Sequence, residues 1–579
     1  MMLVMARRGG QAHVATIRTK GRNGTVYTSY LLRRSYRENG KVKHENLGNL
    51  SHLPVEAIDA VRKILAGETL VDADDAVEII SSRPHGHVAA VLQTLRRLDL
   101  ERLLSRERCR ERDVCVAMIC QLLISPGSKL SMTRRFSQTT LGEELGLGQV
   151  SEPELLAAMD WLAERQDRIE RALARRHLQP GSFVLYDLSS SYVEGRCCEL
   201  AKLGHNRDGK KGKRQVNWGL VCDPEGRPVS VQVHPGNMAD PQTVDRALEK
   251  VKDRFGIKDV ILVGDRAMIT QVRAATLKEL GAGFVSALKT PQIRKLIDGG
   301  DLQLSLFDQQ NLAEITSDEF PGERLVVCRN PALAAERSRK REALLAGTEQ
   351  ELDNICRMVQ GPRGSLRNAS AAKIGERAGR VINKYKVAKH FELHIGDGAF
   401  SYQRKTGQIE TEAALDGIYI LRTTCPPDQL STQAVVRVYK QLKTAERAFR
   451  TIKSTLDVRP IRHHLTSRVQ THFFLFLLAY YVLYELAHQL DAMLYTDDTP
   501  QAPTDPVAPA QRSRTAHAKT ITHHTPDGDP AYSISDLIAE LGTICRNQLK
   551  IGANTFARLT TPNPIQAKAL QLLDIKLTK

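Results

Sequence analysis

Two aspartates lie in or directly after apolar segments that are typical of buried strands. Asp187 belongs to the segment FVLYDL (183–188), and Asp265 ends the segment VILVGD (260–265). A buried carboxylate is costly unless it is paired, hydrogen-bonded or bound to a metal. One aspartate alone is equally well explained as a turn residue that caps Ser189 or Ser190. Two of them at the ends of two apolar strands favour carboxylates that converge on one metal site.

The segments around these aspartates follow the order β-β-β-α-β-α-β. Residues 183–188, 215–222 and 228–234 are predicted to form a three-strand meander. Asp240-Pro241 begins a helix that ends at Gly256, the Asp265 strand follows, and a helix over 270–280 leads to a strand over 284–288. This is the order of the ribonuclease-H-like fold, in which the first and fourth strands carry metal-binding aspartates and a later helix supplies a third acid.

The third acid is expected to be Glu446, on a helix over 431–456. Glu446 shares a stripe with Val435, Tyr439 and Lys453, whose spacings of three and four residues are helical. We therefore expect it on the face that packs against the sheet, whereas the alternative is an ordinary i,i+4 ion pair with Arg450. A basic stripe beside it favours contacts with DNA phosphates and consists of Lys440, Lys443, Arg447 and Arg450.

These segments resemble the DDE transposases of bacterial insertion sequences, specifically the IS-four-like group. The resemblance rests on YDLSSSYVEG around Asp187, VILVGDRAMI around Asp265, and the spacing Tyr439-x6-Glu446-x6-Lys453. One departure is Leu442, which stands where the group usually has an arginine, and the neighbouring Lys443 is a candidate replacement for its DNA contact. Further similar segments are NGKVKHENLGNLSHL (39–53), HPGNMADPQT (234–243), KVAKHFEL (386–393), EAALDGIYILRT (412–423) and STLDVRPIRHH (454–464).

The resemblance implies an enzyme that binds the terminal inverted repeats of an insertion sequence, cleaves DNA at the element ends and transfers the 3′ ends into target DNA. Asp187, Asp265 and Glu446 are then both the catalytic residues and the metal ligands. Three carboxylates can hold two Mg²⁺ ions, for which Mn²⁺ is the expected substitute. The expected partner is double-stranded DNA, bound by a homodimer. A nuclease that cleaves without joining, and a decayed transposase that acts as a repressor on its own ends, remain alternatives.

Tyr439 and Lys453 are implied to contact phosphates at the transposon end. In relatives such contacts accompany a DNA hairpin in which a flipped base stacks on an aromatic side chain. The chain has only Trp161 and Trp218, neither on this helix nor in the segment before it. The aromatic residues that could replace a tryptophan, although strand aromatics usually belong to a core, are Tyr385, Phe391, Phe400 and Tyr402.

Composition agrees with a nucleic-acid partner. The formal charge is +17 and the isoelectric point about 9.4, which favours a polyanion such as DNA. The ten cysteines show no zinc spacing and are expected to be reduced. No secretory signal is expected, and the longest apolar run, residues 473–484, is shorter than the ~18–20 residues of a membrane span. We expect a buried helix there, no membrane contact, and a cytoplasmic, nucleoid-associated protein.

The predicted fold class is α/β, with a ribonuclease-H-like catalytic core interrupted by an α+β insertion. A loop between the first two core strands is rich in Lys and Arg, and we expect phosphate contacts near the cleavage point, rather than mere solvation, from Lys210, Lys211, Lys213 and Arg214. Residues 491–531 are rich in Pro, Thr and Asp and predict a linker, with His517, His523 and His524 as a less favoured metal set. The expected domains are a basic β module for DNA binding (1–52), a helical domain (53–180), the core in two parts (181–290 and 431–490), the insertion (291–430), the linker (491–531) and a C-terminal tail (532–579). The β module is predicted to contain a hairpin turn at Asn39-Gly40 and basic residues that include Arg7 and Arg8. In the helical domain, Ser151 and Glu154 are predicted to form a capping box that opens one long amphipathic helix through Leu173.

Overall fold

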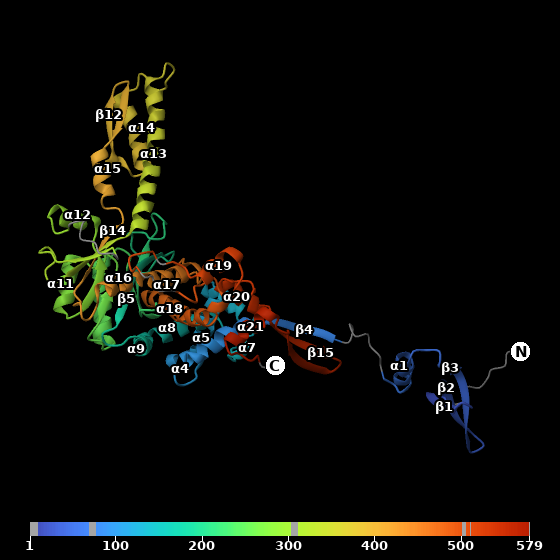
Figure 1. Ribbon diagram of the computed structural model, residues 1–579. Helices are drawn as coiled ribbons and strands as arrows, with labels where there is room; N and C mark the ends of the chain where they lie inside the picture. The colour runs from blue at the N-terminus through green and yellow to red at the C-terminus, as the bar shows by residue number, and fades with distance from the viewer. Residues whose placement is uncertain (1–9, 69–76, 303–310, 501–504, 510, 578–579) are drawn as a thin grey trace. The chain divides into compact units, whose positions relative to one another are not determined.

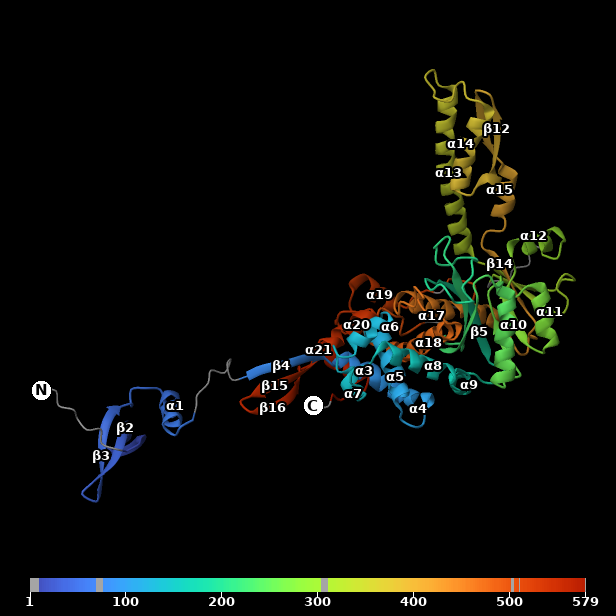
Figure 2. The same cartoon turned by 180° about the vertical axis from the view of Figure 1, so that it is seen from behind.

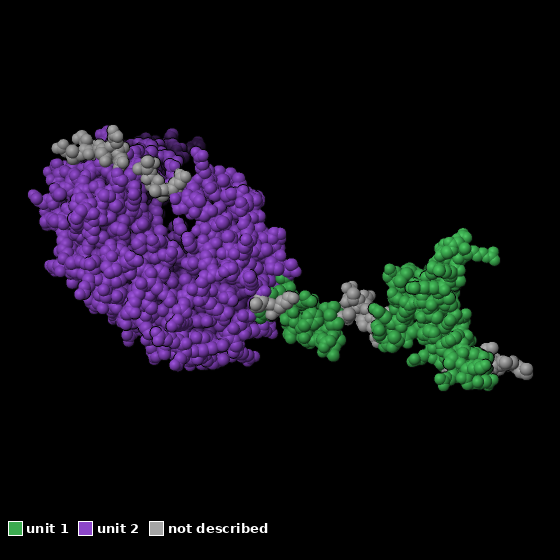
Figure 3. Space-filling model, turned by 60° about the horizontal axis from the view of Figure 1, so that its bottom comes forward, with its two compact units in different colours: residues 1–82, 546–560, 579 green, residues 83–545, 561–578 purple. Residues whose placement is uncertain are grey.

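The computed structural model describes residues 10–68, 77–302, 311–500, 505–509 and 511–577. The chain divides into two compact units, which Figure 3 shows in different colours. The first consists essentially of residues 1–82 and 546–560, and the second of residues 83–545 and 561–578.

The first unit begins with an antiparallel sheet of strand order β1-β2-β3, formed by Ala12–Lys20, Val26–Glu38 and Lys41–Asn49. The expected hairpin turn is present, because Asn39 and Gly40 both have positive φ (49° and 76°), as a tight turn between strands requires. Helix α1 (Val55–Leu65) contacts this sheet through Arg62, which donates to Thr16. The module therefore extends past the predicted boundary at residue 52. Arg7 and Arg8, two of its expected basic residues, lie outside the described residues.

Segments from the two ends of the chain meet in a second small sheet. Its strand order is β16-β15-β4, from Asn554–Leu559, Cys545–Ile551 and Val77–Pro84. Lys550 of β15 pairs with Glu78 of β4 at 3.0 Å. The predicted helical domain over 53–180 therefore contains a strand, β4, that the sequence did not indicate. Although β4 is rich in β-branched residues, its partner strand lies more than 450 residues away in the sequence, so no local pattern could predict the pairing.

Helices open the second unit, as predicted. They are α3 (Gly86–Arg97), α4 (Leu100–Leu104), α5 (Arg110–Ile124), α6 (Lys129–Arg135), α7 (Leu141–Glu144), α8 (Glu152–Ala163) and α9 (Gln166–His177). The capping box at the start of α8 is confirmed, since Glu154 accepts a hydrogen bond from the Ser151 backbone N–H at 2.8 Å. The long helix expected from Ser151 to Leu173 is instead two helices, because the chain turns between α8 and α9.

The central sheet has the strand order β10-β11-β14-β9-β8-β5-β6-β7. Strands β5 (Phe183–Tyr192), β6 (Gln215–Cys222) and β7 (Pro228–Pro235) form the predicted antiparallel meander, while β8 (Ile261–Val263) and β9 (Gly283–Ala287) run parallel to β5. The connecting helices are α10 (Asp240–Glu249, continued by a π-helical turn over Lys250–Arg254), α11 (Gln271–Glu279) and α12 (Thr290–Asp298). Figures 1 and 2 show α10 and α11 on one side of this sheet and α17 and α18 on the other.

Three helices after the insertion cover the sheet: α16 (Thr432–Lys440), α17 (Leu442–Ser454) and α18 (Thr466–Gln489). Trp218 of β6 lies between Phe449 of α17 and Phe473 of α18, with ring centroids 4.6 and 4.9 Å away. By length and hydropathy α18 resembles a membrane-spanning helix, as does the bent pair α5 and α6 if it is taken as one span. However, 83% of the most apolar window of α18 is buried inside the structure, so its apolar surface is covered by protein, as expected for residues 473–484.

The predicted insertion over 291–430 is only partly separate from the core. Strands β10 (Leu312–Ile315), β11 (Arg324–Arg329) and β14 (Ile418–Thr423) extend the central sheet, since β14 pairs with β9. Their apolar residues made them indistinguishable by sequence from strands of a separate domain. The part with its own apolar core comprises α13 (Pro331–Gln360), α14 (Ala371–Lys384), a 3₁₀ turn (Ala388–His390), β12 (Phe391–Gly396), β13 (Ala399–Arg404) and α15 (Thr406–Ala413).

The predicted linker over 491–531 is also wrong, because its described part is folded. It contains a 3₁₀ turn (Asp491–Met493) and helix α19 (Arg514–Thr522), whose first turn is capped by Ser513. Lys519 is fully buried and pairs with Asp498 at 3.2 Å. Polar composition predicted disorder, but these residues satisfy one another's charges and hydrogen bonds. Two further helices follow, α20 (Ile534–Gly542) and α21 (Pro564–Leu572).

Candidate active site

Asp187 lies within strand β5 and not at its end. The parallel pairing with β8 stops at Leu185, which is opposite Val263, whereas the pairing with β6 continues to Tyr192. Asp187 is thus two residues past the last β5–β8 pair, and Asp265 is two residues past it on the other strand. Because side chains alternate along parallel strands in the same register, the two aspartates are placed on one face of the sheet.

That face is the one covered by α17. Tyr186, the residue before Asp187, points to the opposite face, where its hydroxyl interacts with Thr243 of α10. Asp187 must therefore point away from α10 and toward α17, which packs on β5 and carries Glu446. Two residues, Asp187 and Asp265, are half-buried, and Glu446 is exposed.

The exposure of Glu446 corrects the expectation that it lies on the packed face. The stripe predicted over 431–456 is broken at Gln441, so that Tyr439 belongs to α16 and Glu446 to α17. The buried residues of α17 are Leu442, Ala445, Ala448, Phe449 and Ile452. Glu446 follows Ala445 at the border of that face, where a long side chain can reach the acids while staying in contact with water.

The acids influence one another electrostatically. The pKa of Asp187 is raised from 3.8 to about 6, chiefly by burial and also by the negative charges of Glu446 and Asp265, although a hydrogen bond from the Leu188 backbone N–H acts to lower it. The pKa of Tyr439 is raised by burial and then by Asp265, with smaller contributions from Glu446 and Asp187. All three acids therefore lie in one neighbourhood, and Tyr439 lies beside them.

Carboxylate oxygens are the ligands that Mg²⁺ prefers. A divalent ion would also reduce the electrostatic repulsion between negative charges that lie close together without a cation. Within the described ranges, however, no group of three or more His, Cys, Asp or Glu side chains is close enough to hold one ion together. The residues fit a metal by donor type and by shared location. Their side chains would still have to move to ligate the same ion.

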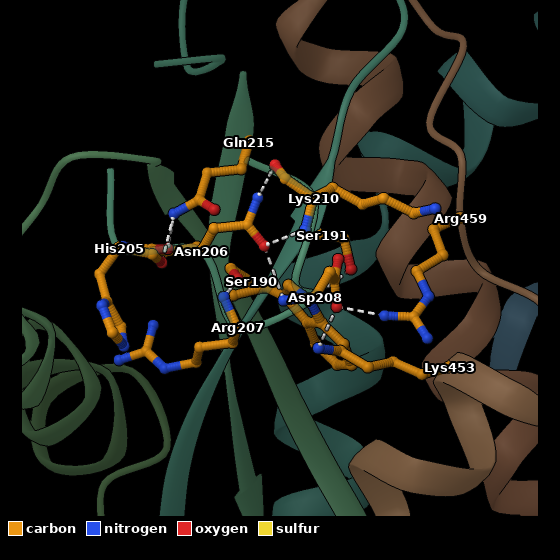
Figure 4. A network of polar contacts seen from close by, with 12 residues as sticks. Ser190, Ser191, His205, Asn206, Arg207, Asp208, Lys210, Gln215, Lys453 and Arg459 are labelled. Atoms are coloured by element: carbon orange, nitrogen blue, oxygen red, sulfur yellow. Dashed lines mark hydrogen bonds and ion pairs between the residues drawn. The ribbon is translucent and has the colours of Figure 1, made fainter. Parts of the chain in front are cut away.

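Lys453 forms an ion pair with a carboxylate that the sequence analysis did not identify as part of the site. Its ammonium donates to Asp208 Oδ1 at 2.8 Å, and Arg459 donates to the same oxygen (Figure 4). The Asp208 side chain is only 2% exposed, and its Oδ2 has no partner among the described residues. Burial lowers the pKa of Lys453, which the Asp208 partner opposes. The available signal was that Asp208 is the only acid in the otherwise basic loop over 202–214.

This loop is folded onto the end of β5. The Arg207 backbone N–H donates to Ser190 at 3.0 Å, and its guanidinium donates to both carboxylate oxygens of Asp240 at 2.7 Å (Figure 4 shows the loop). Asn206 Oδ1 accepts from the backbone N–H groups of Asp208 and Lys210, which fixes the turn between them. The positive charge of Arg207 lowers the pKa of Asp187, so Arg207 is a second missed residue of the site.

The remaining basic residues are presented to solvent. In the loop, Lys210, Lys211, Lys213 and Arg214 are exposed while Arg207 and Asp208 face inward. On α17, Lys443, Arg447 and Arg450 are exposed on the side away from Phe449. Lys440 is different, because its ammonium donates to the carbonyl oxygens of Pro506 and Ala508. The exposed cations thus belong to the loop that carries Arg207 and to the helix that carries Glu446.

The aromatic residues expected to replace a tryptophan are part of a core. Phe391 and Phe400 are 3% exposed, and they pack with Tyr385 and Tyr402 in the apolar cluster of α13, α14 and the β12–β13 hairpin. Tyr402 also donates to Asp353 at 2.6 Å. The structure therefore gives these four rings a packing role and offers no support for hairpin formation.

Comparison with known proteins gives two family matches. Residues 180–482 match the family described as "Transposase DDE domain", and residues 14–75 match "IS1634 family transposase, N-terminal domain". Neither match names the IS-four-like group. No curated protein matches the chain. A cryo-EM structure of a piggyBac transposase synaptic complex with hairpin DNA matches at 8% identity and a TM-score of 0.35, covering 79% of this chain and 76% of that one, a likeness too weak to support an argument.

Proposed function

Because the chain belongs to the family of transposase DDE domains, and is a DDE-type transposase of insertion-sequence kind, we propose that it binds the terminal inverted repeats of its element, cleaves DNA at the element ends and joins the 3′ ends to target DNA. The observation that carries the proposal is the equal offset of Asp187 and Asp265 past the last β5–β8 pair, on the face covered by the Glu446 helix.

The strand order β9-β8-β5-β6-β7, with an antiparallel meander and two parallel neighbours, supports a ribonuclease-H-like arrangement of the core. In this arrangement the acids Asp187, Asp265 and Glu446 are the catalytic residues and would hold the metal. The chemistry supplied by two bound divalent ions, Mg²⁺ or in its place Mn²⁺, is activation of an attacking water or 3′-hydroxyl and stabilisation of the leaving oxygen.

The chain's own residues bind and orient the DNA. The exposed cations of the 202–214 loop, which contacts Ser190 of β5, and of α17, which carries Glu446, contact backbone phosphates. Tyr439 is half-buried beside the acids, where its hydroxyl can donate to a phosphate oxygen near the cleaved bond. Lys453 makes such a contact only by exchanging Asp208 for a phosphate. A homodimer on DNA and assignment to the IS-four-like group belong to this proposal, as does a cytoplasmic, nucleoid-associated location.

The test is incubation of the purified chain with labelled terminal-repeat DNA, a target plasmid and Mg²⁺. Strand-transfer products are expected from the wild type, and binding without cleavage from Asp187→Asn. Asp223→Asn is the matched control. Asp223 is also buried with a pKa raised by burial to about 6, but it lies in the β6–β7 turn and pairs with Arg227.

Each outcome has a distinct meaning. Cleavage without joining would favour a nuclease, and binding without cleavage by the wild type would favour a repressor. Binding to repeat DNA should weaken steeply with salt, because each phosphate contact adds about 0.9 to the slope of log affinity against log salt. A flat salt dependence would contradict the phosphate contacts assigned to the loop and α17.

A further inference from the structure

A basic cavity lies beside the active-site helix α17. It has a volume of about 430 Å³ and is formed by the start of α6, the segment after α17 and the first half of α18. Its cationic lining residues are Lys129, Arg459, Arg462 and Arg468, and His463 and His464 also line it. The whole cavity belongs to the second unit.

Lys129 is the unusual member of this lining. It is only 7% exposed, yet within the described part of the chain its ammonium has no hydrogen bond and no ion pair. Its ammonium nitrogen lies 5.8 Å from the centroid of the Phe476 ring. A buried charge without a partner is costly, since buried charges in proteins are normally paired. Burial accordingly lowers the pKa of Lys129 to about 8, and no carboxylate contributes to raising it.

The arginines that line the cavity, in contrast to Lys129, have carboxylate partners. Arg459 pairs with Asp208, Arg468 pairs with Asp160 at 2.7 Å, and Arg462 lies 3.6 Å from Glu194. Two acids, Glu152 and Asp457, also line the cavity, but neither forms an ion pair with Lys129. The neighbouring His463 is kept neutral, since burial lowers its pKa to about 4. The buried ammonium is therefore the position in the cavity that an anion would complete.

We propose that this cavity binds a phosphate group, with Lys129 as the buried anchor and Arg459 and Arg462 at its entrance. Guanidinium forks and an ammonium are the side chains that match the tetrahedral oxygens of phosphate. Arg459 also donates to the carboxylate that holds Lys453, so the cavity adjoins the cations of the proposed active site. The phosphate comes either from the DNA backbone, in which case the inference rests on the proposed function, or from a free phosphate ion.

The first experiment measures Tm with and without inorganic phosphate at constant ionic strength, with chloride as the balancing salt. Phosphate is expected to raise the Tm of the wild type but not that of Lys129→Met, which keeps most of the length of the side chain and removes the charge. Lys519→Met is the matched control, because Lys519 is also fully buried but already pairs with Asp498 and the Asp491 carbonyl. It should lose stability and keep the phosphate effect.

The second experiment measures the affinity for repeat DNA against salt. If the phosphate belongs to DNA, Lys129→Met should reduce the slope of log affinity against log salt by about 0.9, one phosphate contact, and Lys519→Met should not. A loss of the Tm effect or of one contact in the slope supports the proposal and identifies the source.

The proposal is overturned if Lys129→Met keeps the wild-type slope and phosphate either leaves the wild-type Tm unchanged or raises both Tm values equally. If the wild type binds no repeat DNA, the proposed function fails, and the Tm comparison alone decides the cavity. Should Lys129→Met not fold, the same comparisons apply to Arg462→Gln, whose side chain is 66% exposed.

Discussion

Replacing Asp187 by asparagine is expected to have opposite effects on stability and on metal response. In the folded chain the pKa of Asp187 rises from 3.8 to about 6, so the folded state binds more protons than the unfolded state between these values. Stability is therefore lost as the pH rises from about 4 to about 6, and the loss is complete above that range. At about 1.4 kcal/mol for each tenfold change, the loss at pH 8 is at most about 3 kcal/mol.

Asp187→Asn removes this loss and keeps the hydrogen bond from the Leu188 backbone N–H, which an amide oxygen can also accept. In the presence of a chelator the variant should exceed the wild type by up to about 3 kcal/mol at pH 8, and by less than about 1 kcal/mol at pH 4. Mg²⁺ should stabilise the wild type and leave the variant unchanged, since a ligand stabilises only the state that binds it.

Urea unfolding followed by tryptophan fluorescence suits this measurement, because Trp161 and Trp218 both lie in the second unit with Asp187. Asp223→Asn is again the control. Its pKa is also raised to about 6, but substitution breaks its pairing with Arg227 and should not abolish the response to Mg²⁺. A variant that is no more stable than the wild type at pH 8, or that responds equally to Mg²⁺, would refute the placement of Asp187 among uncompensated acids.

Three further substitutions or conditions test other parts of the structure. Lys453→Ala should slow cleavage of repeat DNA by at least about tenfold, which corresponds to one lost contact of about 1.4 kcal/mol. Lys384→Ala, in the exposed ion pair with Glu351, should leave cleavage unchanged. Normal cleavage by Lys453→Ala would contradict the phosphate contact assigned to Lys453. Arg422→Met should destabilise the second unit by up to about 3–5 kcal/mol, because the buried Glu323 would keep only Lys278, 3.4 Å away, as an ionic partner. The double variant Arg422→Met/Glu323→Leu should recover most of the loss in urea unfolding. Burial lowers the pKa of His234 and His463 from 6.5 to about 4, so the unfolded state binds more protons than the folded state between these values. The free energy of unfolding should therefore fall as the pH drops from 6.5 toward 4, by up to about 3 kcal/mol for each histidine. His234→Gln should flatten the pH dependence of the urea midpoint.

The sequence by itself determined the elements whose signals are local. The apolar run before Asp187, the turn at Asn39-Gly40 and the capping box at Ser151 each specify a conformation through neighbouring residues, and each is present as predicted. The order of strands and helices from β5 to β9 was likewise readable, since connections between successive elements are short and the hydrophobic period changes at each.

Only the tertiary structure decided what depends on distant partners. Because β14 pairs with β9, part of the predicted insertion belongs to the central sheet of the core. In the same way, β4 is a strand because β15 pairs with it. Glu446 is exposed although Leu442 and Phe449, which share its stripe within α17, are buried, so the periodic pattern alone did not show that Glu446 lies at the border of the packed face. Asp208 reached Lys453 across 245 residues. Such contacts form only when loop closure brings distant residues together. Their free energy depends on how deeply these residues are buried, which no local stretch of sequence specifies.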